Sequence, residues 1–157
     1  MYMSLINTLS FIINHPFNKN NKLSSLFCFI KWQFNSRLIK SKYIFKWVDE
    51  TKVIIQKGEH AMTGNLYCGL MEHEDMGFVL HCLRKTDIFY DIGANVGSYT
   101  ILASGVKGCR TICFEPIQST FERLMDNINL NQIGHLVDAK NVGVGSKNEI
   151  LSFTKDL

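Results

Sequence analysis

The chain lacks the features of several protein classes. None of its five cysteines forms a CxxC pair, no His-rich segment accompanies them, and no repeat or low-complexity segment occurs, so the sequence holds no zinc-binding pattern. An odd number of cysteines favours reduced thiols and therefore a cytoplasmic protein. Cys109 and Cys113 lie at the ends of a predicted strand, where small buried apolar side chains are expected rather than metal ligands.

A long apolar run is also missing. The most apolar N-terminal stretch, residues 5–13, is interrupted by Asn7, Thr8 and Ser10 and is too short to span a bilayer. No positive charge precedes it, which argues against a secretory signal peptide. We therefore expect a helix that packs against another part of the protein.

Acidic residues are absent from residues 1–48, which hold seven Lys and Arg. We expect residues 1–50 to form a basic amphipathic helical extension. Basic, aromatic and aliphatic residues together allow residues 17–47 a weak contact with a membrane surface. The favoured alternative is a helical cap on the core, since a helix with one apolar face is usually packed. We exclude a nucleic-acid partner, because the acidic remainder would oppose a phosphate backbone.

Residues 51–87 are predicted to lead into the core. Short β-type runs at 53–56 and 66–67 indicate a small hairpin or an edge strand. Helical spacing follows over residues 72–83, with three acids in the first turn, where the helix dipole favours them.

Residues 88–157 alternate between strand and helix patterns. Strands are predicted at 88–92, 110–114 and 136–144, with a further one at 149–153. One helix follows the first strand, and a capping box from Ser119 to Glu122 predicts the start of a second. This βαβαβ order is the first half of a doubly wound α/β sheet, which binds its ligand at the carboxyl ends of the strands.

The segment DIGANVGSYT, residues 91–100, joins the first of these strands to its helix. Gly93 and Gly97 bracket a turn that needs positive φ, and the helix start offers backbone N–H groups to a carboxylate or phosphate. A dinucleotide turn would carry a middle glycine for the pyrophosphate, but Asn95 stands there. The spacing therefore favours the amino-acid end of S-adenosylmethionine over a nicotinamide cofactor, with the ammonium near Asp91 or a carbonyl near Gly93.

Glu115 is the second candidate. It follows an apolar strand 22 positions after Gly93, where a carboxylate can accept hydrogen bonds from both ribose hydroxyls. The alternative for Glu115 is an exposed loop acid.

Three segments resemble one family. DIGANVGSYT, CFEP at 113–116 and TFERLMDNINLN at 120–131 are similar to the FkbM family of S-adenosylmethionine-dependent methyltransferases, and residues 63–76 resemble a bacterial subset of it. The resemblance implies a class I, Rossmann-like methyltransferase fold, with the glycine turn around the methionine moiety, Glu115 on the ribose and the end of the third strand near the adenine. The implied cofactor-binding residues are Asp91, Gly93, Ala94, Asn95, Gly97, Ser98, Glu115, Pro116, Asn141 and Val142.

The resemblance further implies O-methylation of a hydroxyl on a sugar or other secondary metabolite. Tyr67 and Glu72 are candidates to close over the site. The alternative is that Tyr67 is an aromatic residue packed in the core and that Glu72 is an acid in the first turn of a helix. No histidine lies at the carboxyl end of a strand, so we assign no general base, and no metal is expected.

An acidic strand-end motif of the family does not occur before Leu157, so we expect only the first half of the domain. The alternative is a non-catalytic fragment whose N-terminal helices bind a membrane surface or a partner protein.

Overall fold

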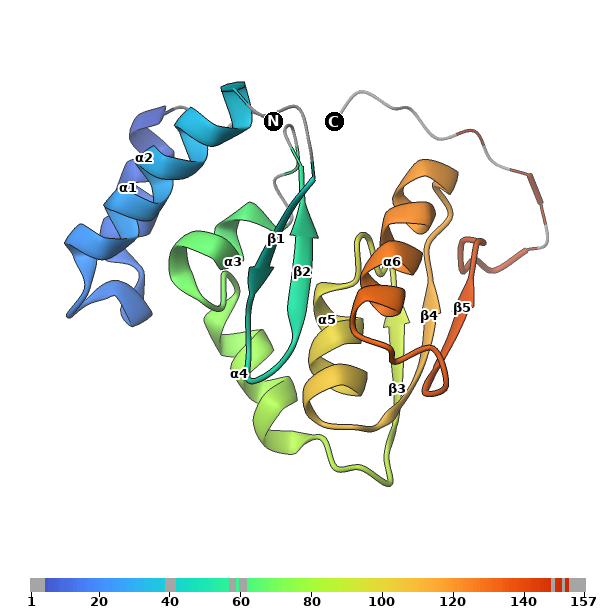
Figure 1. Ribbon diagram of the computed structural model, residues 1–157. Helices are drawn as coiled ribbons and strands as arrows, with labels where there is room; N and C mark the ends of the chain where they lie inside the picture. The colour runs from blue at the N-terminus through green and yellow to red at the C-terminus, as the bar shows by residue number, and fades with distance from the viewer. Residues whose placement is uncertain are drawn as a thin grey trace.

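Two sheets and a series of helices make up the protein (Figure 1). The computed structural model describes residues 5–38, 42–56, 59, 62–147, 149–150 and 152. The elements are, in chain order, α1 (Leu5–Asn14), the 3-10 turn η1 (Pro16–Asn18), α2 (Lys22–Leu38), β1 (Tyr43–Lys46), β2 (Lys52–Ile55), α3 (Thr63–Cys68), α4 (His73–Cys82), β3 (Ile88–Ile92), α5 (Ser98–Thr100), the π-helix η2 (Ile101–Val106), β4 (Arg110–Phe114), α6 (Gln118–Leu130) and β5 (Val137–Lys140).

The larger sheet is parallel and has the order β3-β4-β5. Helices α5–η2 and α6 connect its strands and lie on one face of it (Figure 1). Asp91 of β3 pairs in register with Cys113 of β4, and both side chains are buried on the covered face. The opposite face carries Ile88, Tyr90 and Ile92, each more than half exposed. This alternation confirms the predicted α/β half-sheet.

The hairpin of β1 and β2 is attached to α6 through two asparagine side chains. Asn127 Oδ1 accepts the N–H of Ile54 at 2.8 Å, and Asn131 Oδ1 accepts the N–H of Lys52 at 2.8 Å. The amide of Asn131 donates back to the Lys52 carbonyl at 2.7 Å, and that of Asn127 donates to the Val96 carbonyl at 2.8 Å. The Asn-rich end of α6 therefore joins the hairpin to the glycine turn.

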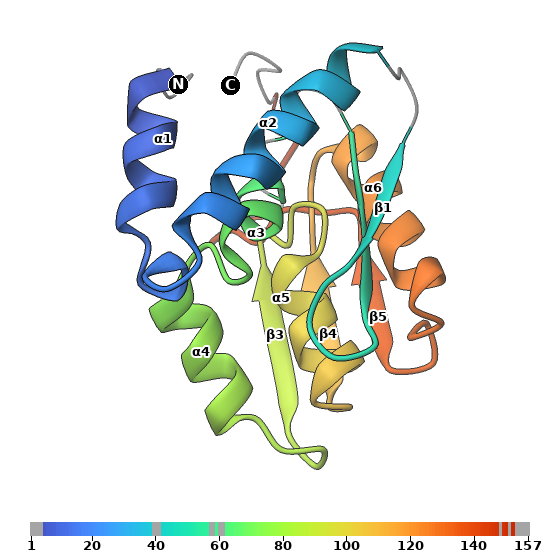
Figure 2. The same ribbon diagram turned by 60° about the vertical axis from the view of Figure 1, so that its left-hand side comes forward.

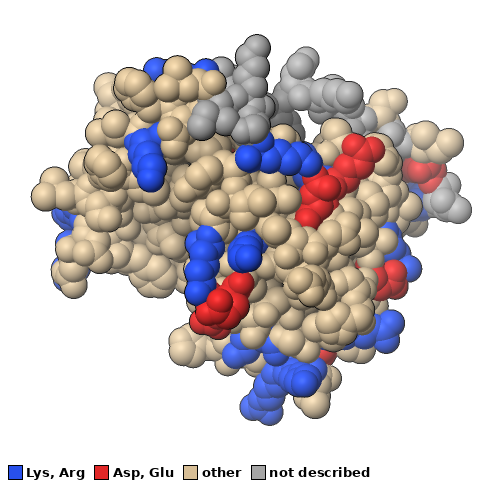
Figure 3. Space-filling model, in the orientation of Figure 1, with Lys and Arg blue, Asp and Glu red and all other residues tan. Residues whose placement is uncertain are grey.

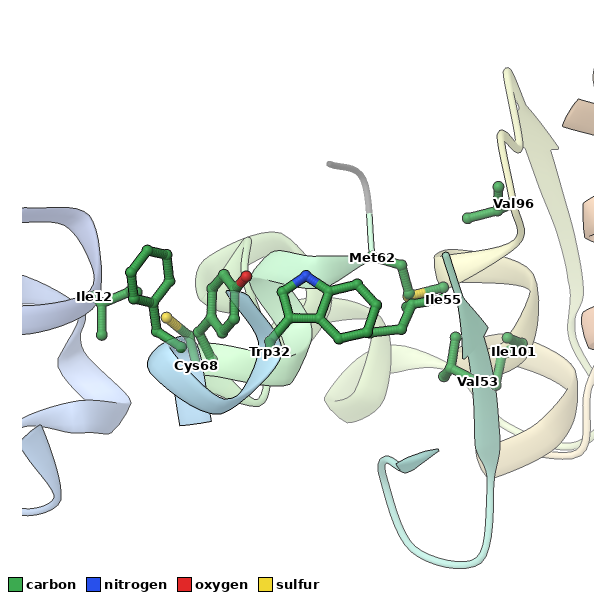
Figure 4. Close-up of a cluster of buried hydrophobic side chains, with 10 residues drawn as sticks. Ile12, Trp32, Val53, Ile55, Met62, Cys68, Val96 and Ile101 are labelled. Atoms are coloured by element: carbon green, nitrogen blue, oxygen red, sulfur yellow. The ribbon is translucent and has the colours of Figure 1, made fainter. Parts of the chain in front are cut away.

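One apolar cluster runs from the N-terminal helices to the glycine turn (Figure 4). Ile12 of α1 is fully buried, which confirms the predicted packed helix. Trp32 of α2 lies in the same cluster as Val53, Val96 and Ile101. Side chains of α1 and α2 therefore pack on the core and reach the element that follows the glycine turn.

Three local predictions are wrong. Residues 66–67 lie in α3 rather than in a strand, because Asn65 Oδ1 accepts the Met71 N–H and holds a buried helical turn. The hairpin partner of β2 is instead β1, within the segment expected to be helical. Helix α6 begins at Gln118 with Ile117 as N-cap, so Ser119 lies inside the helix and does not cap it.

Fewer residues after β4 form strands than predicted. Strand β5 ends at Lys140, so residues 141–144 leave the sheet. Of the strand predicted at 149–153, residues 149–150 and 152 are irregular, and the others lie outside the described residues. Cys109 and Cys113 are fully buried free thiols, as expected. Across the described ranges, no helix is long and apolar enough to cross a membrane, and no group of three His, Cys, Asp or Glu could hold a metal ion.

Candidate active site

A cavity of about 560 Å³ opens at the carboxyl ends of β3 and β4, on the face of the sheet that the helices leave uncovered. Apolar walls with a few polar groups are typical of small-molecule sites, and this edge of a parallel sheet is where such sites lie. Three predicted site residues, Gly93, Pro116 and Val142, line the cavity. The full lining is Ile92, Gly93, Phe114, Pro116, Val142, Gly143, Val144, Gly145, Lys147 and Glu149.

The glycine turn contains three residues with left-handed backbone. Gly93 has a φ of 80°, Asn95 one of 51° and Gly97 one of 96°. A Cβ on Gly93 would meet no atom within 4 Å, whereas a Cβ on Gly97 would lie 2.6 Å from Leu124 Cδ1. Gly93 therefore leaves open space at the cavity, and Gly97 allows the turn to approach α6.

Backbone hydrogen bonds hold this turn against β4. The N–H groups of Gly93 and Ala94 both donate to the Phe114 carbonyl at 2.9 Å, and that of Gly97 donates to the Ala94 carbonyl at 2.9 Å. These donors are therefore used within the fold. The N–H groups of Ser98 and Tyr99 belong to the first turn of α5, where a helix provides no intrahelical acceptor.

Glu115 links the glycine turn to the end of β4. Its Oε2 accepts the N–H of Asn95 at 3.0 Å, and its Oε1 accepts that of Ile117 at 2.9 Å. The residue is 5% exposed, so it is not an exposed loop acid. Because each carboxylate oxygen can accept two hydrogen bonds, each keeps one further acceptor position.

Asp91 lies on the covered face, behind the turn. Its carboxylate accepts the hydroxyl of Thr100 at 2.6 Å. Burial raises the pKa of Asp91, the hydrogen bonds from Thr100 lower it, and the charge of Glu115 raises it further. Thr100 is thus a partner of Asp91, a role that the sequence does not reveal, because it depends on the way the helix turns back over the strand.

The other predicted residues are distributed around the turn. Ala94 is buried against α6, Asn95 is exposed, and Ser98 Oγ lies 3.5 Å from Met62 Sδ. The amide of Asn141 donates to the carbonyls of Glu115, at 2.8 Å, and Pro116, at 3.3 Å. Asn141 therefore joins the ends of β4 and β5.

The two residues considered as a cover for the site have different environments. Tyr67 is a packed aromatic in the apolar cluster, 5.4 Å from the ring of Phe29. Glu72 accepts the hydroxyl of Tyr99 at 2.6 Å. Burial, followed by the Glu72 carboxylate, raises the pKa of Tyr99. Glu72 thus ties the start of α4 to α5.

Phe114 and Ile92 line the cavity but are absent from the predicted set. The sequence marks Phe114 and Ile92 as strand residues. It contains no signal for which face of the strand the helices leave open.

Comparison with protein-family models and with curated proteins finds no match for this sequence, so membership of the FkbM family is not shown and remains a prediction. Similar solved structures include TYW2 of Pyrococcus horikoshii in complex with MeSAdo, at 15% identity and a TM-score of 0.54 over 66% of this chain and 37% of that chain. Another is the tRNA m1G37 methyltransferase of M. jannaschii, at 17% identity and a TM-score of 0.50 over 66% of this chain and 31% of that chain. The chain spans about a third of the length of these proteins.

These comparisons correct one expectation. The exclusion of nucleic acid as a partner is wrong, because a structure of the same fold is a tRNA methyltransferase. The acidic balance of residues 49–157 is therefore no ground for that exclusion. Two predictions about the fold are confirmed. The strand and glycine pattern predicts a doubly wound α/β half-sheet, and the family resemblance implies a class I, Rossmann-like methyltransferase fold; the described sheet and its helices form part of that fold.

Proposed function

We propose that this chain provides the S-adenosylmethionine-binding half of a methyltransferase. The observation that carries the proposal is the cavity at the carboxyl ends of β3 and β4, with Gly93 at its wall and the buried Glu115 beside it. The complex of P. horikoshii TYW2 with MeSAdo supports it from a structure of the same fold.

The residues around the cavity fit the chemical parts of this cofactor. Ile92, Phe114 and Val142 offer apolar surface to the adenine and ribose rings. The free acceptor positions of Glu115 suit the ribose hydroxyls. Gly93 leaves room for the methionine moiety, and the first-turn N–H groups of α5 suit its carboxylate.

The bound cofactor supplies a methyl group already activated as a sulfonium, so the protein's main task is to hold the acceptor in line with it. The resemblance to the FkbM family favours a hydroxyl of a sugar or other secondary metabolite as acceptor. The tRNA methyltransferase of the same fold makes an RNA acceptor the second candidate. Within this proposal, residues 88–157 carry the cofactor site, and residues 1–50 and 51–87 support it.

Titration calorimetry of the whole chain with S-adenosylmethionine tests the proposal. Glu115→Gln removes the charged acceptor, and we expect affinity to fall by about tenfold or more, since hydrogen bonds to charged groups contribute about 1.5–3 kcal/mol. Glu122→Gln, on the exposed side of α6, is the matched control and should leave affinity unchanged.

A second variant tests the cavity without disturbing a buried group. Val142 is exposed at the cavity wall, so Val142→Trp should fill the space and weaken binding, while Ile44→Trp on β1 should not. Absence of binding by the folded chain, or binding that neither Glu115→Gln nor Val142→Trp weakens, would contradict the proposal and favour the non-catalytic interpretation.

A further inference from the structure

Helix α2 carries apolar side chains on two opposite faces. Phe29 and Trp32 on its inner face are buried in the apolar cluster. Its outward side faces away from the sheet (Figure 2). There the spacing i, i+4, i+7, i+11 and i+15 places five side chains in one row, each more than half exposed. We name this row the outer stripe; it consists of Leu23, Phe27, Ile30, Phe34 and Leu38.

Packing of α2 on the core does not account for the outer stripe. The inner face alone attaches the helix, whereas the outer stripe leaves two phenylalanines and three aliphatic side chains in water. Soluble proteins rarely expose a continuous apolar patch of this kind unless it meets a partner or a membrane. Leu5, Ile6 and Phe17 on the neighbouring α1 and η1 are exposed as well.

The charges beside the outer stripe have one sign. With 100° between successive helical residues, Lys31 and Arg37 lie on opposite sides of the row, and both are exposed. Over the described parts of the chain, Lys42 and Lys46 form ion pairs with acids, whereas none is found for Lys31 or Arg37. In Figure 3 the surface over α1 and α2 shows blue atoms and no red ones.

We propose that the outer stripe docks α2, lying flat, on an anionic lipid surface. The apolar row would enter the boundary between headgroups and acyl chains, and Lys31 and Arg37 would extend their amino and guanidinium groups to the lipid phosphates. A helix in this position need not be long enough to cross the bilayer. The surface is separate from the cavity, so the inference does not depend on the proposed function.

Charge argues against two other occupants. A second copy packed on the stripe would bring Lys31 and Arg37 close to their own counterparts, without an acid in residues 1–48 of either chain to neutralise them. An RNA backbone would satisfy the basic residues but would leave the five apolar side chains without an apolar partner. An anionic lipid surface matches both the charge and the apolar row.

Co-sedimentation of the whole chain with vesicles tests the inference. We expect binding to phosphatidylcholine vesicles that contain phosphatidylserine, weaker binding to phosphatidylcholine alone, and a decrease with added salt, because exposed charges are screened. The double variant Phe27→Ser/Phe34→Ser should weaken binding by more than about tenfold, since burial of each ring contributes about that factor. Phe78→Ser is the matched control, because Phe78 on α4 is 68% exposed, as are Phe27 and Phe34.

The charge variant Lys31→Glu/Arg37→Glu should weaken binding only to the anionic vesicles, and Lys85→Glu should not. Thermal unfolding followed by circular dichroism should be nearly unchanged in all of these variants, because the substituted side chains are exposed. Equal binding to both kinds of vesicle, or none, overturns the inference. So does a dimer that Phe27→Ser/Phe34→Ser dissociates without any vesicle binding, or RNA binding that depends on Lys31 and Arg37 but not on the phenylalanines.

Discussion

The two faces of the sheet formed by β3, β4 and β5 differ in what they meet. On the covered face, Asp91 and Thr111 are buried and find hydrogen-bond donors on the helices: Thr100 donates to Asp91, and Ser104 donates to Thr111 at 2.7 Å. On the open face, Ile88 and Ile92 are apolar and exposed. The sheet therefore carries polar side chains at some of its buried positions and apolar side chains at exposed ones.

This difference between the two faces indicates which face stabilises the fold and which face is available to bind a ligand. Parallel sheets normally have both faces covered, and their strands are apolar on both sides. The described helices cover only one face, and the cavity opens on the other, beside Ile92 and Phe114. The stability of the folded chain should therefore depend on the covered face, and ligand binding on the open one.

Removal of a buried side chain from the covered face should give the largest effect. Leu124 of α6 is fully buried against Ala94 and Cys113, so Leu124→Ala should lower the free energy of unfolding by about 2–5 kcal/mol. Ile92→Ala on the open face should cost less than about 1 kcal/mol. Urea unfolding measures both, and equal losses would show that the open face is covered in solution.

Alanine substitutions at Gly93 and Gly97 test the same difference between the two faces within the glycine turn. In Gly97→Ala the new methyl group meets Leu124, so we expect a cost of about 1–2 kcal/mol for the left-handed backbone and at least about 1 kcal/mol for crowding. Gly93→Ala should show only the backbone cost, because a Cβ there meets open space. If Gly93→Ala proves the more destabilising in urea unfolding, the assignment of Gly97 to the covered side is wrong.

A change of charge on the covered face should depend on pH. Burial raises the pKa of Asp91, so the folded protein favours the protonated acid. The protonated Asp91 side chain therefore stabilises the folded protein fully below the ordinary Asp pKa of about 4. This stabilisation is lost as the pH rises through the raised pKa of Asp91 in the folded protein. Asp91→Asn keeps an oxygen for Thr100 without the charge, so it should unfold at a higher temperature than the original chain at neutral pH.

This advantage of Asp91→Asn should shrink toward pH 4. Thermal unfolding at several pH values measures it. A difference that stays constant with pH would show that the charge of Asp91 carries no penalty in the folded state.

The smallest effect should come from the centre of the open face. Tyr90 is more than half exposed, so Tyr90→Ser should change the free energy of unfolding by less than about 0.5 kcal/mol. It should also reduce the fluorescence of a dye that binds exposed apolar surface. A loss of about 2 kcal/mol or more would reveal a partner for this face.

The sequence predicts the parts of the fold that depend on local pattern. The short apolar run at Ile88–Ile92, the glycines of the turn and the apolar spacing of residues 121–128 identify the half-sheet and its helices. Residues 66–67 mislead, because these two β-type residues lie in a helical turn that the hydrogen bond from the Met71 N–H to Asn65 Oδ1 holds. The hairpin of β1 and β2 is held to α6 by Asn127 and Asn131, which are distant from it in sequence.

The sequence likewise predicts only part of the candidate site. Gly93 could be identified from its place in the turn, and Glu115 from its place after a strand. The hydrogen bond from Thr100 to Asp91 and the position of Phe114 at the cavity wall depend on which face the helices cover. The hydrogen bonds from Asn141 to the carbonyls of Glu115 and Pro116 depend on how the ends of β4 and β5 come together. No local pattern contains that information.

The contact of α6 with β2 has a consequence for the alignment of the hairpin. Four residues of a helix rise about 6.0 Å and two residues of a strand advance about 6.6–6.8 Å, so Asn127 and Asn131 match the spacing of Ile54 and Lys52. The helix thus fixes the position of the strand: a shift of β2 by one residue would leave the Oδ1 atoms of Asn127 and Asn131 without their partners on β2. It also occupies backbone groups on the outer edge of β2, which would otherwise be open to pairing with a strand of another molecule.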